Sequence, residues 1–170
     1  MATSTIECVG CGGRVPDLEG PIHRYMIASP GCWRAYTELM AGGLPPSRHS
    51  ALAVDAYAVT HPGLAGPQST PSVWIHLITL CCVLERGWSV EKAVFLRRLA
   101  ADGFRAWPWL ARPDRMGEVN AVDLALALER GDGGAAIELT DRWVRGAWSA
   151  WSAQHGAVRV RATELISRLG

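Results

Sequence analysis

Four potential metal ligands lie within the first 32 residues: Cys8, Cys11, His23 and Cys32, in the spacing C-x2-C-x11-H-x8-C. Two thiols two residues apart can bind one metal ion from a single turn, and a histidine with a third thiol can complete a tetrahedron. Glycines on both sides of Cys11 are typical of a zinc knuckle. The sequence therefore predicts that zinc, rather than a core of its own, holds residues 1–28 as an irregular arm.

The identity of the fourth ligand is left open by the spacing alone. His23 is the nearest histidine in the sequence, but His61 or His76 could take its place, or both could join two cysteines in a Cys2His2 site. A closed Cys3His site is structural more often than catalytic, because it has no open coordination position. If His23 points elsewhere, a water molecule could take that position and make the metal reactive.

The rest of the chain is predicted to be all-α, a bundle of five or six helices. Ser29 is a good N-cap with Pro30 at the first helical position, and Asn120 with Asp123 forms a second start signal. We expect helices over residues 29–41, 47–60, 70–86, 89–102, 120–130 and 135–169. The last segment carries one apolar stripe from Val144 to Leu169, as one helix or as two with a break near Gly146 or Gly156. No segment shows clean strand alternation.

Length and composition indicate a single domain over residues 1–170, with the arm at 1–28 and the helical bundle at 29–170. The first ten residues lack the basic and apolar regions of a signal peptide, and the longest apolar stretch, 73–84, is too short to span a bilayer. A cytoplasmic protein is therefore expected, in which five cysteines serve metal binding and burial rather than disulfides. The net charge of +1 disfavours nucleic acid and membrane surfaces as partners, and a homo-oligomer is compatible with the sequence.

Four polar residues fall on otherwise apolar helix faces and are the candidates for catalysis: Asp55, His61, His76 and His155. If these side chains converge inside the bundle, Asp55 would orient an imidazole, and His61 or His76 would move a proton. Each histidine could instead be a core or cap residue bonded to a backbone carbonyl. The sequence holds no P-loop, no G-x-G-x-x-G after a strand, no H-E-x-x-H and no G-x-S-x-G, which disfavours nucleotide and serine-hydrolase chemistry.

Two functions remain in competition. The first is a zinc-dependent enzyme that performs a hydrolysis, an elimination or a cyclisation on a small molecule. The second is a zinc-stabilised module that binds a protein or a ligand without catalysis. A closed metal site without a cavity in the bundle would favour the module, whereas convergence of the polar residues would favour the enzyme.

A series of short motifs resembles an uncharacterised bacterial family of unknown function. The motifs are Cys8–Gly12, Gly20–Tyr25, Ser29–Trp33, Val54–Gly63, Gln68–Ser69 and His76–Leu77. The resemblance covers residues 7–87 well and the last helix loosely. Thr60 stands where the family has Gln before its His-Pro pair, and Thr70-Pro71 interrupts the loop before the third helix. The resemblance implies a bacterial source and no particular activity.

Overall fold

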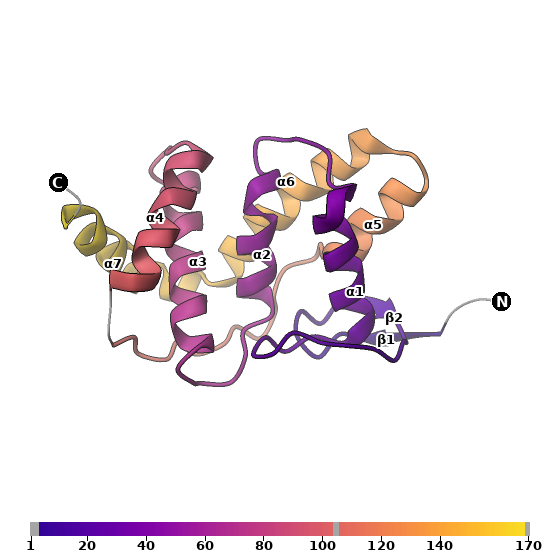
Figure 1. The fold of residues 1–170 in the computed structure, drawn as a ribbon, viewed down its shortest axis with the longest axis horizontal. Coiled ribbons are helices and arrows are strands. Elements are labelled where there is room, and N and C mark those ends of the chain that lie inside the picture. The colour runs from indigo at the N-terminus through magenta and orange to yellow at the C-terminus, as the bar shows by residue number, and fades with distance from the viewer. Residues whose placement is uncertain (1–3, 104–105, 169–170) are drawn as a thin grey trace.

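The computed structural model describes residues 4–103 and 106–168, and it is mostly helical (Figure 1). The elements in chain order are β1 (Thr5–Glu7), β2 (Arg14–Pro16), α1 (Pro30–Glu38), a π-helical stretch (Leu39–Gly43), a 3-10 turn (Ser50–Leu52), α2 (Ala53–Thr60), α3 (Ser69–Leu84), α4 (Val90–Gly103), α5 (Ala121–Glu129), α6 (Gly133–Ala150), a second 3-10 turn (Ser152–Gln154) and α7 (His155–Ser167). The mostly helical class is confirmed, with seven α-helices in the described ranges where five or six were expected.

The N-terminal arm contains a small hairpin that the sequence did not reveal. Strands β1 and β2 pair antiparallel, with Ile6 opposite Val15. Each strand has only three residues, too few for an alternating pattern to be recognised. The connection between them, residues 8–13, carries the first two cysteines of the predicted metal site.

The predicted start signals lie where helices begin. Ser29 is the extended N-cap residue of α1, with Pro30 as the first helical residue. Asn120 and Asp123 form a capping box at the start of α5, in which the Asn120 side chain accepts a hydrogen bond from Val122 N. Capping depends on residues that are neighbours in the sequence, so these helix starts could be predicted without knowledge of the tertiary packing.

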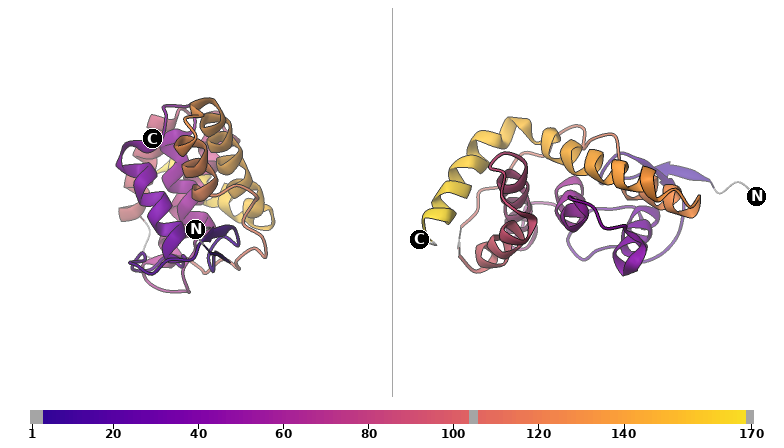
Figure 2. Two further views of the ribbon diagram at one scale, coloured as in Figure 1. Left: turned by 90° about the vertical axis from the view of Figure 1, so that its right-hand side faces the viewer. Right: turned by 90° about the horizontal axis from the view of Figure 1, so that it is seen from above.

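The helices form two layers. Helices α1 to α4 lie side by side, and α6 and α7 run across them on one side (Figure 2). Helix α2 packs against both α3 and α6, and α3 also packs against α4 and α7. Every residue of α2 except Val54 is buried, so a polar side chain on this helix lies in the interior by position alone.

The long C-terminal segment bends between α6 and α7. The apolar residues of the predicted stripe are buried from Val144 to Leu165, His155 within it is partly buried, and Leu169 lies outside the described residues. The break falls at the 3-10 turn Ser152–Gln154, just before Gly156. Here the Trp151 indole donates a hydrogen bond to Val59 O, 3.0 Å away, and thereby attaches the bend to α2. Among the described helices, none combines the length and apolar character that crossing a bilayer requires.

Candidate functional site

Three predicted cysteines and one histidine form a buried cluster. The ligand atoms of Cys8, Cys11, Cys32 and His61 all lie within 4.8 Å of one another, and all four residues are buried. His61 Nε2 lies 3.2 Å from Cys32 Sγ and 3.8 Å from Cys8 Sγ, and Cys11 Sγ lies 4.0 Å from Cys32 Sγ. Such a group could hold a metal ion.

Each ligand is positioned by the element from which it comes. Cys8 and Cys11 lie in the turn of the β1–β2 hairpin, where Gly12 N donates to Cys8 O and Gly12 has a left-handed φ of 74°. Cys32 lies in the first turn of α1. A backbone N–H also reaches the cluster, because Ser29 N donates to Cys8 Sγ over 3.4 Å. Hydrogen bonds of this kind stabilise the thiolate form of a cysteine.

His61 is oriented by its own helix. It caps the C-terminus of α2, and its Nδ1 lies 2.9 Å from Tyr57 O, one turn earlier. A proton on Nδ1 is therefore donated to that carbonyl, which leaves Nε2 as the atom that faces the sulfurs. This is the outer hydrogen bond that metal-bound histidines usually make. Gly10 lies so close to the His61 ring and to Ile27 O that a Cβ atom would collide with both.

The donor set and the spacing are compatible with Zn²⁺. In a tetrahedral site, Zn–S and Zn–N bond lengths imply S–S separations of about 3.8 Å and S–N separations of about 3.6 Å. The three separations given above, 3.2, 3.8 and 4.0 Å, lie within about half an ångström of these values. Sulfur and imidazole ligands are also those that zinc prefers over calcium or magnesium. Four protein ligands would fill the coordination sphere.

The electrostatics of the cluster require a cation if all three sulfurs are to ionise. Hydrogen bonds from the Cys11 and Cys32 thiols lower the pKa of Cys8 well below its ordinary value. Hydrogen bonds with Cys11 and Cys8, together with burial, raise the pKa of Cys32 far above its ordinary value. Without a metal, Cys8 is thus favoured as a thiolate while Cys32 stays protonated. A divalent cation would stabilise the negative charge on all three sulfurs together.

The first choice of fourth ligand, His23, lies outside the cluster. Its Nδ1 faces the backbone N–H groups of Tyr25 and Met26, at 3.4 and 3.3 Å, and its ring packs edge-on against Tyr25 and Trp33. The structure therefore places His61 where His23 was expected. The physical reason is that the local turn at His23 satisfies its ring nitrogen, whereas the end of α2 directs His61 at the sulfurs.

A second polar cluster joins α2, α3 and α4. The buried Asp55 carboxylate accepts from His76 Nδ1 at 2.8 Å and from Arg97 Nη1 at 2.9 Å. Asp55 is fully buried, whereas the His76 and Arg97 side chains retain 13 % and 19 % of their exposure. Because the His76 side chain keeps some exposure, a small molecule could contact its ring from outside.

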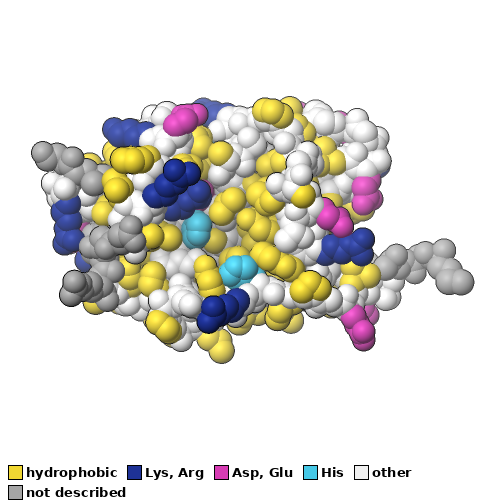
Figure 3. All heavy atoms as spheres, in the orientation of Figure 1, with side chains coloured by type: hydrophobic (Ala, Val, Ile, Leu, Met, Phe, Trp, Pro, Cys, Tyr) yellow, Lys and Arg dark blue, Asp and Glu magenta, His cyan; other side chains and the backbone are white. Residues whose placement is uncertain are grey.

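Histidines are visible on one face of the molecule. Figure 3 shows histidine side chains at the surface of this face, beside Lys or Arg side chains and among hydrophobic ones. Asp55 and His61 are six residues apart on α2, about 9 Å along the helix axis, so the polar cluster and the cysteine cluster are separate sites.

The four predicted catalytic residues do not converge on one site. Asp55 and His76 meet, while His61 belongs to the cysteine cluster. His155 lies at the start of α7, where its ring stacks on Trp148 and its Nε2 contacts Trp148 O at 3.0 Å. Its Nδ1 is 3.7 Å from Glu85. His155 thus matches the alternative of a histidine satisfied by a backbone carbonyl.

Two arginines with important contacts were not recognised from the sequence. Arg97 forms an ion pair with the buried Asp55. Arg112 donates to the carbonyls of Val9 and Gly10 and so holds the cysteine turn from the outside. Arg112 is about a hundred residues from that turn, and no local pattern marks such a contact.

Together, the fold and the site define a mostly helical protein with a buried Cys3His group that could bind a metal. A family model described as a family of unknown function, DUF5946, matches residues 6–152, and the chain belongs to this family. The expected membership of a family of unknown function is thereby confirmed. No curated protein and no solved structure matches the chain.

Proposed function

We propose that this protein is a zinc protein in which the metal is structural. The observation that carries the proposal is the convergence of three sulfurs and one imidazole nitrogen within 4.8 Å in a buried position. A closed set of four protein ligands has no open position for a substrate or a reactive water. This geometry supports the zinc-stabilised module over an enzyme whose reaction takes place at the metal.

The metal would fasten three separate segments to one another. The hairpin turn supplies Cys8 and Cys11, the start of α1 supplies Cys32, and the end of α2 supplies His61. The hairpin has only two three-residue strands, so its own hydrogen bonds contribute little stability. Binding free energy at such a site is folding free energy for the segment that it anchors.

The test is the metal content of the purified protein beside two matched double variants. Native protein should contain one zinc per chain, and Cys8→Ser with Cys11→Ser should lose it. The control is Cys81→Ala with Cys82→Ala, because these cysteines are also buried but lie in the last turn of α3. The control should keep its zinc even if it is less stable. Native protein without metal, or zinc retained in the Cys8/Cys11 variant, would contradict the proposal.

A second candidate function is acid–base catalysis on a small molecule at Asp55 and His76, and a specific geometry favours it. A buried carboxylate on His76 Nδ1 fixes the tautomer in which Nε2 carries no proton, and the His76 side chain is partly exposed. Arg97 compensates the Asp55 charge through its own contact with the other carboxylate oxygen. In this arrangement His76 would move the proton in a hydrolysis, an elimination or a cyclisation, and the metal would take no part.

Turnover of ester, phosphoester and lactone substrates would test this candidate. His76→Ala should abolish any activity found while leaving zinc content unchanged. The matched control is His155→Ala, which also removes a half-buried histidine but lies away from Asp55. Equal turnover by the native protein and His76→Ala, or no turnover of the three substrate classes by the native protein, would contradict acid–base catalysis at this site.

A further inference from the structure

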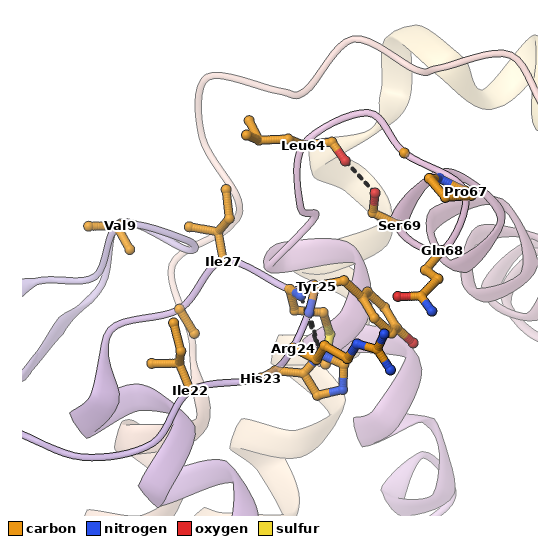
Figure 4. Close-up of a pocket in the computed structure, with 13 residues that line it drawn as sticks. Val9, Ile22, His23, Arg24, Tyr25, Ile27, Leu64, Pro67, Gln68 and Ser69 are labelled. Carbon is orange, nitrogen blue, oxygen red and sulfur yellow. Dashed lines mark hydrogen bonds between the residues drawn. The ribbon is translucent and has the colours of Figure 1, made fainter.

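A pocket of about 450 Å³ lies between the arm and the loop that joins α2 to α3 (Figure 4). One wall comes from residues 22–28, and the other comes from residues 64–69, with Val9 of the cysteine turn at the edge. The volume is within the range of pockets that bind small organic molecules. The pocket is lined by different residues from those of the Asp55 cluster.

One side of the pocket is apolar and unusually exposed. Val9, Ile22 and Leu64 are 60 %, 55 % and 78 % exposed, and Leu64 is the most exposed large hydrophobic side chain in the described part of the chain. Three exposed aliphatic side chains around one hollow form a patch rather than the scattered surface residues that need no explanation. Covering them would remove apolar area from water and favour binding of an apolar body.

The other side of the pocket is polar and carries positive charge. The side-chain ends of Arg24, Tyr25 and Gln68 lie near one another there, on the side away from Val9 and Ile22 (Figure 4). Arg24 is the charged lining residue, and no Asp or Glu lines the pocket. A guanidinium beside an amide and a phenol hydroxyl is suited to an anionic oxygen group.

Backbone contacts fix the shape of the pocket. Gly63 approaches Tyr25 O so closely that any Cβ atom at this position would collide with it. Within the second wall, Gly66 N donates to Thr70 Oγ1 over 3.2 Å, and the Ser69 hydroxyl donates to Leu64 O. Because these contacts hold both walls, binding would need little reorganisation of the chain.

From these observations we propose that the pocket binds a small organic acid. Its apolar body would lie against Val9, Ile22 and Leu64, and its carboxylate, sulfonate or phosphate group would contact Arg24. Charge complementarity and size select this ligand class: the lining carries one cation and no acid, and the volume suits a single small molecule. The inference goes beyond the structural zinc site, and it holds whether or not His76 is catalytic.

The experiment is a fluorescence titration of the zinc-loaded protein with 1-anilinonaphthalene-8-sulfonate, an aromatic sulfonate. Binding should be saturable, and Arg24→Gln should weaken it about tenfold through loss of a charge-assisted contact. Arg130→Gln, at an exposed position after α5, is the matched charge control and should leave binding unchanged. Leu64→Ser should weaken binding, whereas Leu126→Ser, at an exposed position on α5, should not.

A competition experiment separates the role of the acid from that of the apolar body. Decanoate should displace the fluorescent probe about tenfold more effectively than decanol, since only decanoate can pair with Arg24. Equal displacement by both, no probe binding, or equal binding by native protein and Arg24→Gln would overturn the proposal. A dimer that Leu64→Ser abolishes would also overturn it, by showing that a second copy covers the patch. Zinc content measured for every variant shows whether a loss of binding reflects a loss of the metal site instead.

Discussion

At the scale of single residues, His61 and His23 offer the sharpest comparison. His61→Ala should remove one of the four proposed zinc ligands and lower metal affinity strongly, because His61 Nε2 faces the cysteine sulfurs. His23→Ala should leave zinc content unchanged, because the His23 ring bonds to its own turn instead. Mass-spectrometric metal analysis of both variants checks this. Zinc lost from His23→Ala and retained in His61→Ala would reverse the assignment.

His61 and His23 also show which of the metal ligands could be predicted from the sequence. Cys8 and Cys11 were identifiable because C-x-x-C is a local pattern with a direct physical meaning. Their partners had to be chosen by distance along the sequence, which favoured the nearby His23 and left His61 and His76 as alternatives. His61 lies 29 residues beyond Cys32, and only the packing of α2 against the arm brings its ring to the sulfurs.

Gly10 provides a second prediction at this scale. A methyl group at Gly10 would collide with Ile27 O and with the His61 ring, so Gly10→Ala must displace one of them. We expect a loss of about 1–3 kcal/mol in the free energy of unfolding, together with weaker zinc binding. Gly156→Ala is the control, because the space around Gly156 within α7 is open. Chemical denaturation should show that this control is as stable as the native protein or more stable.

At the scale of secondary-structure elements, Asp55 connects α2 to both α3 and α4. Asp55→Ala would leave His76 and Arg97 without their carboxylate. We expect a destabilisation of about 2–3 kcal/mol, less than for a fully buried pair because both partners retain contact with water. Urea unfolding measures the change. His76→Ala should cost less, since the Asp55–Arg97 pair survives it, and the opposite order would show that the imidazole is the main connection.

The short 3-10 turn before α2 gives a prediction on pH. Burial lowers the pKa of His49, the residue before this turn, against the opposing effect of Asp141, whose carboxylate is 2.8 Å away. The unfolded chain therefore takes up a proton at His49 near pH 6.5, whereas the folded chain does so only at lower pH. The unfolded state binds more protons in that window, so the free energy of unfolding should fall as the pH drops below about 6.5.

His49→Gln should flatten this dependence. The measurement is urea unfolding of native protein and variant between about pH 6.5 and pH 5. Zinc release at low pH affects both proteins equally, because the cysteine cluster is the same in both, and it cancels in the difference. Parallel curves for the two proteins would show that His49 does not contribute to the pH dependence.

The starts of helices could be predicted where capping residues next to them in the sequence mark the start. Pro30 after Ser29 and the Asn120–Asp123 box predicted the starts of α1 and α5, because capping depends on neighbouring residues. The bend between α6 and α7 was harder to place. It occurs at Trp151, whose indole bonds to Val59 on another helix, and such a contact has no local signature.

At the scale of the whole molecule, the arm and the helical body differ in what holds them. The helices supply most of one apolar core, and the arm adds only a few buried side chains to it: Cys8, Cys11, Val15 and Ala28. The division into an arm over residues 1–28 and a body over residues 29–170 stays a prediction. This division predicts the effect of metal removal: if the metal anchors only the arm, the helical body should stay folded without it.

Zinc removal should therefore release the arm without unfolding the body. After chelation, far-UV circular dichroism should retain most of its helical signal, because the helices outside the arm keep their packing. Limited digestion with trypsin should become fast at Arg14 and Arg24, which lie on either side of the arm's midpoint, and the cleaved sites can be identified by mass spectrometry. Digestion of the zinc-loaded protein under the same conditions is the control. Loss of the entire helical signal on chelation would instead mean that the metal supports the whole fold, since α1 and α2 each supply one of its ligands.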